Sequence, residues 1–493
     1  MIFTLAFRHL LVRKLRSLFL LLGFSLGVGV MIVLLSVGEA MLEQSRDVSL
    51  VGGGEVTVLP QGIDIEAMRT GGIGSMFFGI DRSRFLVRQV FGGARNRHLV
   101  RAVSPALEGK LLYLKRGDRV LPVRAGGEIP SRATAMGAGL RLLGGTWQDS
   151  PADSSHVDPS TQQLYDELDR FHLPRVPDST WGEWHYFNLV TSPHEWWYIT
   201  YLVGGAVGRD QRTQEDSARW GGLLLVTHRR PDGTYQRFER REPSRGVTLD
   251  TLGADLRIGQ SSVRQRDGVY RLQARVPGEA GAVRIDVVLR PGTNQYFPPV
   301  ELRDDEFRSG YVVPGLVATA TGSICVSRRC QSFRDAPAYH DHNWGTWRNV
   351  TWEWGAGQGS RLAVLYGGVY GPDRDPTPDR SGVRSPFFLT LVDSLGVKQV
   401  LRFDRIHYQG AMPLRGSDAA SSPRRFDLVA TREQDTLHLA VAVMDALGTS
   451  MKTRGLQRTF IQMRGRFTVT GRVLGLAVSD SGAGFFETYA TPR

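Results

Sequence analysis

The chain has 493 residues, which is too long for one ordinary domain. Its 57 glycines and 24 prolines, with frequent aromatic and β-branched runs, favour a globular protein rich in β structure. The net charge of +12 comes from scattered arginines without a long basic block, which argues against a nucleic-acid partner and favours a basic surface near an anionic membrane.

The N-terminal segment has the pattern of a membrane anchor. Residues 1–16 are basic and contain no acid, and residues 17–37 follow without a charge. About 20 apolar residues suffice to cross a bilayer, and a positive flank stays cytoplasmic. We therefore predict a single-pass protein of the cytoplasmic membrane whose C-terminal part is extracytoplasmic (periplasmic). A cleaved signal peptide and a buried core helix are the alternatives, although a signal peptide usually has a shorter apolar core of about 7–15 residues.

Residues 38–147 give a weaker pattern, with short strands predicted at Glu55–Leu59 and His98–Ala102. The sequence AFRHLLVRKLRSLFLLLG, followed by GVGVMIVLLSVGEAM and EVTVLPQG, resembles the start of an ABC transporter permease of the MacB/FtsX type. That family has several membrane helices, whereas no second apolar run of about 20 residues appears here. The resemblance therefore implies a permease-like extracytoplasmic stub, with ABC transporter subunits as candidate partners.

The composition and the hydrophobic pattern of the sequence change near residue 180. Residues 148–180 are polar and rich in Pro, Asp and Ser, which predicts a linker with one short helix at Thr161–Phe171. Short apolar or alternating runs then recur between Gly, Pro and Asp turns, as is typical of a β-sandwich or β-barrel. The predicted strands are Glu195–Leu202, Gly222–His228, Val283–Leu289, Leu316–Ile324, Leu362–Tyr370, Phe387–Val392, Leu437–Val443, Phe460–Gly465 and Phe467–Val473. The glycine-rich run 355–360 is interpreted as a hairpin turn and Arg374–Arg384 as a loop.

The two cysteines, Cys325 and Cys330, bracket Val-Ser-Arg-Arg. If Ile324 ends one strand and Gln331 starts the next, the cysteines face each other across a hairpin. An extracytoplasmic location permits a disulfide between them. Two free thiols are the alternative.

The segment Ala338–Trp354, AYHDHNWGTWRNVTWEW, carries the densest group of chemically active side chains. On an extended strand, side chains alternate between faces. One face would carry Tyr339, Asp341 and Asn343, and the other His340, His342 and Trp344. An aspartate beside apolar rings can keep its proton near neutral pH, so Asp341, Tyr339, His340 and His342 are the candidate catalytic residues. A polar cluster that closes the end of a β-barrel is the structural alternative.

A metal site is a weaker interpretation of the same histidines. His340 and His342 could bind a metal together with His185 or His194, but two histidines on one face are too few for a site. We therefore predict no metal and no cofactor.

A second aromatic run, Trp181–Ile199, has the sequence WGEWHYFNLVTSPHEWWYI. Packing in a barrel core explains most of its rings. Some could instead line an apolar cavity, which a barrel of about eight strands can hold. The candidate ligand-binding residues are Trp344, Trp184, Trp196, Trp197, Tyr198 and Glu195.

Three stretches together carry a resemblance to a known family: HEWWYIT, AYHDHNWG and the closing run GRFTVTGRVLGLAVSDSGAGFFETY. They resemble the AttH-type, lipocalin-like family that includes bacterial carotenoid 1,2-hydratases (hydroxyneurosporene synthases). The resemblance covers about residues 181–489 and extends more distantly to tocopherol cyclases and fungal lipocalin-like Diels–Alderases. It implies a mainly β fold with two lipocalin-like antiparallel β-barrels in tandem, at residues 181–345 and 346–493, after the membrane helix and the extracytoplasmic segment.

The resemblance also implies a chemistry. In the hydratases a proton is added to a terminal alkene and water captures the tertiary cation. Asp341 would then be the proton donor, Tyr339 its partner and Trp344 a ring facing the cation. The first hypothesis is a membrane-anchored, hydratase- or lyase-like enzyme for an apolar isoprenoid or lipid. The alternatives are a non-catalytic, lipid-binding accessory of an ABC transporter and, more weakly, a hydrolase, although no nucleophile–base pair is visible.

Overall fold

The computed structural model describes two compact units, residues 1–87 with 100–158 and residues 88–99 with 159–493. The described residues are 15, 18–19, 22–33, 36, 58, 83–84, 86–87, 90, 97–100, 102–117, 119–135, 148–153, 162, 166, 168–175, 177, 179–205, 207, 220–279, 281–303, 307–347, 351–370, 387–414, 420–453 and 456–490.

The first unit contains a helical stretch at residues 22–33. Among the described residues, no helix is both long and apolar enough to cross a membrane. Residues 17, 20–21, 34–35 and 37 of the predicted anchor lie outside the described residues, so the anchor stays a prediction. The unit also contains a hairpin that the sequence did not predict, with β1 (Ala106–Arg116) and β2 (Arg119–Glu128), followed by α5 (Pro130–Ala135).

Two short strands were expected before this hairpin. The strand at His98–Ala102 is a wrong prediction, because Arg97–Leu99 form a 3₁₀ helix, η2. No described strand pairs with this segment, and a strand without a partner is not stable. The predicted strand Glu55–Leu59 lies outside the described residues except for Val58, as does the whole of the predicted loop Arg374–Arg384.

The second part of the predicted linker is not a solvent-exposed chain. Residues 162, 166 and 168–169 are helical, in agreement with the predicted short helix. Leu168, Asp169 and Phe171 are buried at 4%, 0% and 3% exposure, and Phe171 belongs to the core of the first sheet. This segment therefore belongs to the folded β-rich unit.

The first sheet of the second unit has 12 strands, and every pairing in it is antiparallel. The strand order is β6-β5-β4-β3-β14-β13-β11-β10-β9-β8-β7, with β12 on β13. A bridge between Phe238 of β6 and Gly278 curls the sheet into a barrel-like shape. Its strands are β3 (Trp181–Ser192), β4 (Glu195–Gly204), β5 (Gly221–Arg229), β6 (Tyr235–Pro243), β7 (Val247–Leu249), β8 (Leu256–Ile258), β9 (Ser261–Arg266), β10 (Val269–Val276), β11 (Val283–Pro291), β12 (Phe297–Arg303), β13 (Phe307–Val326) and β14 (Arg329–Trp347), with η3 (Ser244–Gly246) after β6.

The second sheet has nine strands in the order β18-β17-β16-β15-β25-β24-β23-β22-β19. A pairing between Arg402 of β18 and Thr431 of β22 closes it. The predicted strands 460–465 and 467–473 are one continuous strand, β24. The strands are β15 (Thr351–Gly359), β16 (Ala363–Tyr370), β17 (Phe387–Asp393), β18 (Gly396–Phe403), β19 (Ile406–Gln409), β22 (Arg425–Arg432), β23 (Asp435–Thr453), β24 (Leu456–Val473) and β25 (Leu476–Ala490); β20 (Met412–Pro413) and β21 (Ser421–Ser422) pair separately.

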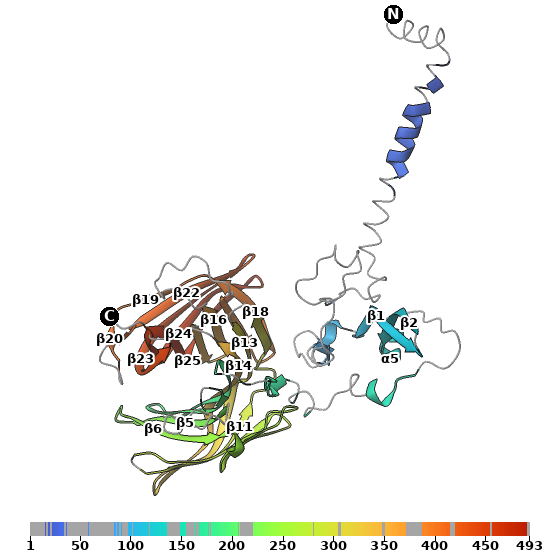
Figure 1. The fold of residues 1–493 in the computed structure, drawn as a ribbon. Coiled ribbons are helices and arrows are strands. Elements are labelled where there is room, and N and C mark those ends of the chain that lie inside the picture. Colours follow the sequence, from blue (N-terminus) through green and yellow to red (C-terminus); the bar gives the residue numbers. More distant parts are fainter. Residues whose placement is uncertain are drawn as a thin grey trace, which may run out of the picture. The chain divides into compact units, whose positions relative to one another are not determined.

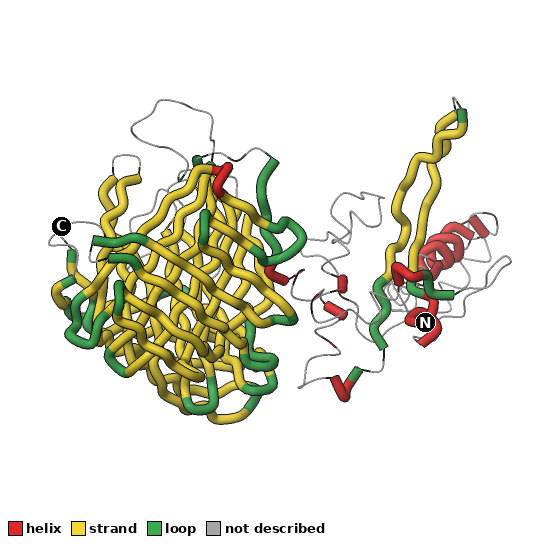
Figure 2. Tube along the Cα trace, turned by 90° about the horizontal axis from the view of Figure 1, so that it is seen from below, coloured by secondary structure: helices red, strands yellow, loops and turns green. Residues whose placement is uncertain are grey.

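The predicted fold class is confirmed: the second unit is mainly β (Figure 2), with two barrel-like antiparallel sheets in tandem (Figure 1). The predicted boundary at residues 345 and 346 falls just before β14 ends at Trp347. Each sheet encloses its own apolar core, and a third cluster of buried rings contains residues of both sheets. Residues 338–342 of β14 are buried on both faces, because one face lines the first sheet's interior and the other contacts the second sheet.

Only the end of the glycine-rich run 355–360 forms the predicted hairpin turn, where the Gly359 amide donates to the Leu362 carbonyl oxygen at 2.8 Å. Residues 355–359 belong to the strand β15. A Cβ at Gly355 would lie 2.4 Å from the Tyr366 ring, and one at Gly357 would lie 2.6 Å from the Phe467 ring. The glycines therefore make room for aromatic rings inside the second sheet. Pattern alone cannot separate such a strand from a turn, because glycine occurs in both.

A disulfide joins Cys325 and Cys330 across the hairpin between β13 and β14, with an S–S distance of 2.06 Å. The two residues also face each other in the strand register. The bridge therefore lies at the start of the strand that carries Asp341.

Replacing both cysteines with serine is expected to lower the free energy of unfolding by no more than about 2 kcal/mol, because the closed loop is short. Non-reducing peptide mapping should recover Cys325 and Cys330 in one cross-linked peptide, and urea unfolding should show the small loss. Free alkylation of both thiols, in protein made in an oxidising compartment, would contradict the bridge.

Candidate functional site

Asp341 on β14 belongs to a hydrogen-bonded group of three side chains on one face of the strand. The Tyr339 hydroxyl donates to Asp341 Oδ2 at 2.7 Å, and Asn343 Nδ2 donates to Asp341 Oδ1 at 2.6 Å. Asp341 is only 3% exposed. The three side chains therefore lie together, as the alternation of a strand predicts.

The second sheet encloses this group. Trp354 Nε1 on β15 donates to the Tyr339 hydroxyl at 3.0 Å, and the Phe485 ring of β25 lies 4.6 Å from the Tyr339 ring, measured between centroids. Tyr186 of β3 contacts the rings of Tyr339 and Phe485 at 6.3 and 5.6 Å. Aromatic rings from both sheets therefore surround Tyr339, the hydrogen-bond partner of Asp341.

These surroundings favour the protonated form of Asp341. Burial raises its pKa well above the usual value, and the carboxyl of Glu487 adds to the rise, while the hydrogen bonds from Tyr339 and Asn343 and the charge of His342 oppose it. Burial also raises the pKa of the Tyr339 hydroxyl well above its usual value. When Asp341 is neutral, its hydroxyl can donate to the Tyr339 oxygen, which frees the phenolic hydrogen for another acceptor. The pair can therefore hold one proton and pass it on.

Glu487 on β25 is a second buried carboxyl in the region where the sheets meet. Trp352 Nε1 donates to Glu487 Oε2, and Gln462 Nε2 donates to Glu487 Oε1, each at 3.2 Å. Burial raises the pKa of Glu487 to about 7 against the effect of these two hydrogen bonds. Glu487 thus adds a second group that can exchange a proton near neutral pH.

The other face of β14 points into the first sheet and carries a buried ion-pair network. His342 lies between two carboxylates, with Nδ1 2.7 Å from Asp169 Oδ1 and Nε2 3.0 Å from Glu183 Oε1. Burial alone would lower the pKa of His342, but Asp169 and Glu183 raise it to about 10. His340 also belongs to this face, where its Nδ1 is 3.1 Å from the Tyr186 carbonyl oxygen. The two candidate catalytic histidines therefore lie on the opposite face of the strand from Asp341.

The six predicted ligand-binding residues do not form one site. Trp184, Trp196 and Tyr198 belong to the aromatic cluster around Tyr339. The other three lie elsewhere: Trp344 stacks on His172 at 3.9 Å, Trp197 stacks on His228 at 3.6 Å, and Glu195 Oε1 is 2.9 Å from His228 Nε2. Neighbouring strand positions face opposite sides, which separates Trp196 from Trp197.

Asp169, Glu487 and Trp354 join these networks although little in their local sequence selects them as site residues. Asp169 lies in the polar stretch that predicts a linker, and only the apolar neighbours Leu168 and Phe171 indicate that it is buried. Glu487 and Trp354 face each other in the register of β15 and β25, across a long sequence separation. A local pattern cannot indicate such a pairing.

No protein-family profile and no curated protein matches this sequence. Among solved structures, the chain is similar to a Nitrosomonas europaea protein provisionally identified as AttH, with 15% identity and a TM-score of 0.44, covering 65% of this chain and 96% of that one. It is also similar to CghA (9%, TM-score 0.45, 68% and 97%) and to kievitone hydratase from Nectria haematococca (13%, TM-score 0.41, 68% and 94%). All three TM-scores are below 0.5, so the assignment of the site depends on this chain's own geometry.

Replacing Glu487 with glutamine is expected to flatten the pH dependence of stability. Because the folded-state pKa of about 7 lies above the usual value, the folded protein binds more protons than the unfolded chain, and wild-type stability falls as the pH rises from about 4.5 to about 7. The wild-type loss is expected to be on the order of 2–3 kcal/mol. Glutamine can still accept from Trp352 but cannot ionise. The thermal midpoint of the Glu487→Gln protein should therefore change less over this pH range than that of the wild type.

The control is Glu279→Gln, which changes an exposed carboxyl in the same way and should keep the wild-type slope. Calorimetry at several pH values between about 4.5 and about 7 measures how the thermal midpoint of each of the three proteins depends on pH. Equal slopes in wild type and Glu487→Gln would contradict the role given to Glu487.

Proposed function

We propose that this chain is an acid catalyst of the hydratase or cyclase type, acting on an apolar small molecule that contains an alkene. One observation carries the proposal: the Asp341 carboxyl is 3% exposed and accepts from the Tyr339 hydroxyl at 2.7 Å, and Tyr339 packs among aromatic rings of both sheets. Such surroundings keep a carboxylic acid protonated until a substrate arrives.

The proposed reaction begins with proton transfer from the Asp341–Tyr339 pair to one alkene carbon, which leaves a carbocation on the other carbon and a negative charge on Asp341. In hydration, a water oxygen bonds to the cation and its proton returns to Asp341. In cyclisation, a second alkene of the same molecule bonds to the cation, and a neighbouring carbon loses a proton to Asp341. Both routes restore the neutral acid and need no other reactant than water.

The aromatic rings support the cationic intermediate. A cation within about 6 Å of a ring face is stabilised by about 0.5–2 kcal/mol, and more when water is excluded. The resemblance gives this role to Trp344, but Trp344 lies on the opposite face, where its Nε1 donates to Glu301 Oε2 at 3.3 Å. We assign the role to Trp354 and Phe485, which contact Tyr339 directly.

A non-catalytic, lipid-binding protein is the second candidate, and one contact favours it. The hydrogen bond from Trp354 Nε1 to the Tyr339 hydroxyl joins the two sheets through buried groups. In this view the Tyr339–Asp341 pair stabilises the contact between the sheets, and its loss costs about 1–3 kcal/mol for each buried group left unsatisfied. Membrane anchoring through residues 17–37 is a prediction that belongs to either candidate, and association with ABC transporter subunits is a prediction of the second.

The variant Asp341→Asn separates the two candidates. Asparagine keeps the shape, can accept from Asn343 and, like the neutral acid, can donate to the Tyr339 oxygen. It cannot supply the proton, so turnover should fall at least about 100-fold while the thermal midpoint changes little. Turnover is measured on acyclic isoprenoids with a terminal alkene, incubated in deuterated water, by the mass increase of the product.

The matched control is Asp335→Asn, on the same strand. Asp335 is exposed and has a φ of 51°, a backbone conformation that asparagine tolerates well, so both turnover and melting should stay at the wild-type level. If wild type incorporates no deuterium and Asp341→Asn melts much earlier, the pair is structural and the catalytic assignment fails.

A further inference from the structure

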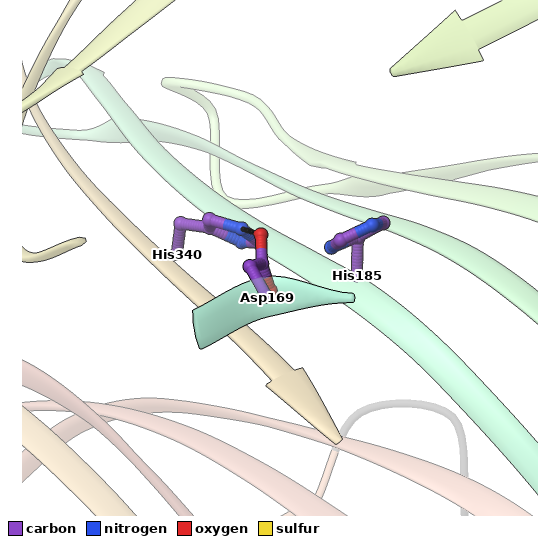
Figure 3. A group of neighbouring side chains, drawn as sticks. All are labelled: Asp169, His185 and His340. Carbon is purple, nitrogen blue, oxygen red and sulfur yellow. Dashed lines mark ion pairs between the residues drawn. The ribbon is translucent and has the colours of Figure 1, made fainter. Parts of the chain in front are cut away.

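Three fully buried side chains meet inside the first sheet: Asp169, His185 of β3 and His340 of β14. One ligand atom from each lies within 4.8 Å of the other two. Figure 3 shows Asp169 between the two imidazole rings. None of the hydrogen bonds around Asp341 involves these three side chains, so the proposed catalysis does not account for them.

Each histidine has one nitrogen within hydrogen-bond distance of a backbone carbonyl oxygen and the other without a hydrogen bond. His185 Nε2 is 3.0 Å from the Ala254 carbonyl oxygen, and His340 Nδ1 is 3.1 Å from the Tyr186 carbonyl oxygen. Within the part of the chain that the structure describes, His185 Nδ1 and His340 Nε2 have no hydrogen-bond partner. Metal-binding histidines have this arrangement, because a carbonyl fixes the ring while the other nitrogen binds the ion.

The distances fit a small divalent ion. His340 Nε2 is 3.6 Å from Asp169 Oδ2, which is too long for a hydrogen bond. Bonds of about 2.0–2.2 Å in a tetrahedral centre place the ligand atoms about 3.3–3.6 Å apart. The ligand atom of His185 lies within 4.8 Å of the other two and would move inward to complete this geometry. Asp169 Oδ2 also accepts from the Tyr270 hydroxyl at 2.7 Å, the kind of contact that orients a metal-binding carboxylate.

We propose that Asp169, His185 and His340 bind one divalent transition-metal ion, such as Zn²⁺ or Fe²⁺. Two imidazoles and one carboxylate are a ligand set that suits both ions. His342 is not a fourth ligand, because both of its nitrogens are already within hydrogen-bond distance of Asp169 and Glu183. A buried water is the alternative occupant, since it also could bond to three polar groups.

The metal would have a structural role. It would connect the segment that carries Asp169 to β3 and β14, which are far apart in sequence but paired in the sheet. The proposed ion would lie on the face of β14 opposite to Asp341, inside the apolar core that includes Phe187 and Tyr270. Removing the ion should therefore lower the melting temperature without direct loss of the proton donor.

The test uses the full chain, purified without a histidine tag or added chelator. Mass spectrometry of the bound elements should find about one Zn²⁺ or Fe²⁺ ion for each chain. Dialysis against a chelator should lower the thermal midpoint, and added Zn²⁺ should restore it. Background metal content after addition of either ion, with a chelator-insensitive midpoint, would overturn the proposal and leave water as the occupant.

The variants His185→Gln and His340→Gln should each weaken Zn²⁺ binding at least about 100-fold, measured by competition with a coloured chelator. The matched control is His228→Gln, because His228 is also buried but bonds to Glu195 outside the cluster. Equal loss of metal in all three variants, or in none, would show adventitious binding and overturn the proposal. If a ligand variant does not fold, the chelator experiment on wild type decides the question.

Discussion

The burial of β14 on both faces is the constraint on which the rest of this unit depends. An ordinary barrel strand exposes alternate side chains to water, but residues 338–342 have no exposed side. Water cannot reach the polar groups on this stretch, so they depend on partners in the protein or, at His340 Nε2, on the ion proposed above. Tyr339 pairs with Asp341 and with Trp354 of the second sheet, while His342 pairs with Asp169 and Glu183 inside the first.

This constraint explains why two chemical environments lie on the two faces of one short stretch of β14. On one face, burial and aromatic rings favour neutral acids, because few opposite charges are near Asp341. On the other face, burial lowers the pKa of His342, but two carboxylates raise it by more and keep the imidazole charged. The peptide backbone separates the two environments by the thickness of a sheet. The proposed proton donation and the proposed ion binding would therefore not compete for the same groups.

The sequence predicts the β fold and the grouping of Tyr339, Asp341 and Asn343, because both follow from the two-residue period of a strand. It does not predict the partners that come from far along the chain. Asp169 and His342 are 173 positions apart, and Trp354 meets Glu487 only through the pairing of β15 with β25. The glycine-rich pattern also predicts a turn where Gly355 and Gly357 lie in a strand. Glycine is common in turns, but at these two positions it makes room for aromatic rings. Local patterns therefore predict which face a side chain occupies but not what it contacts there.

The pairing of β3 with β14 has a consequence for how the protein is made. β3 begins at Trp181, but its partner β14 ends only at Trp347, so the first sheet cannot close until most of the chain has left the ribosome. Until then β3 exposes an unpaired, aromatic edge, which is the kind of surface that leads to aggregation. Pairing between strands that are so far apart in sequence raises the contact order, which also predicts slow folding. During synthesis this chain should therefore depend on chaperones more than a protein whose neighbouring strands follow one another in sequence.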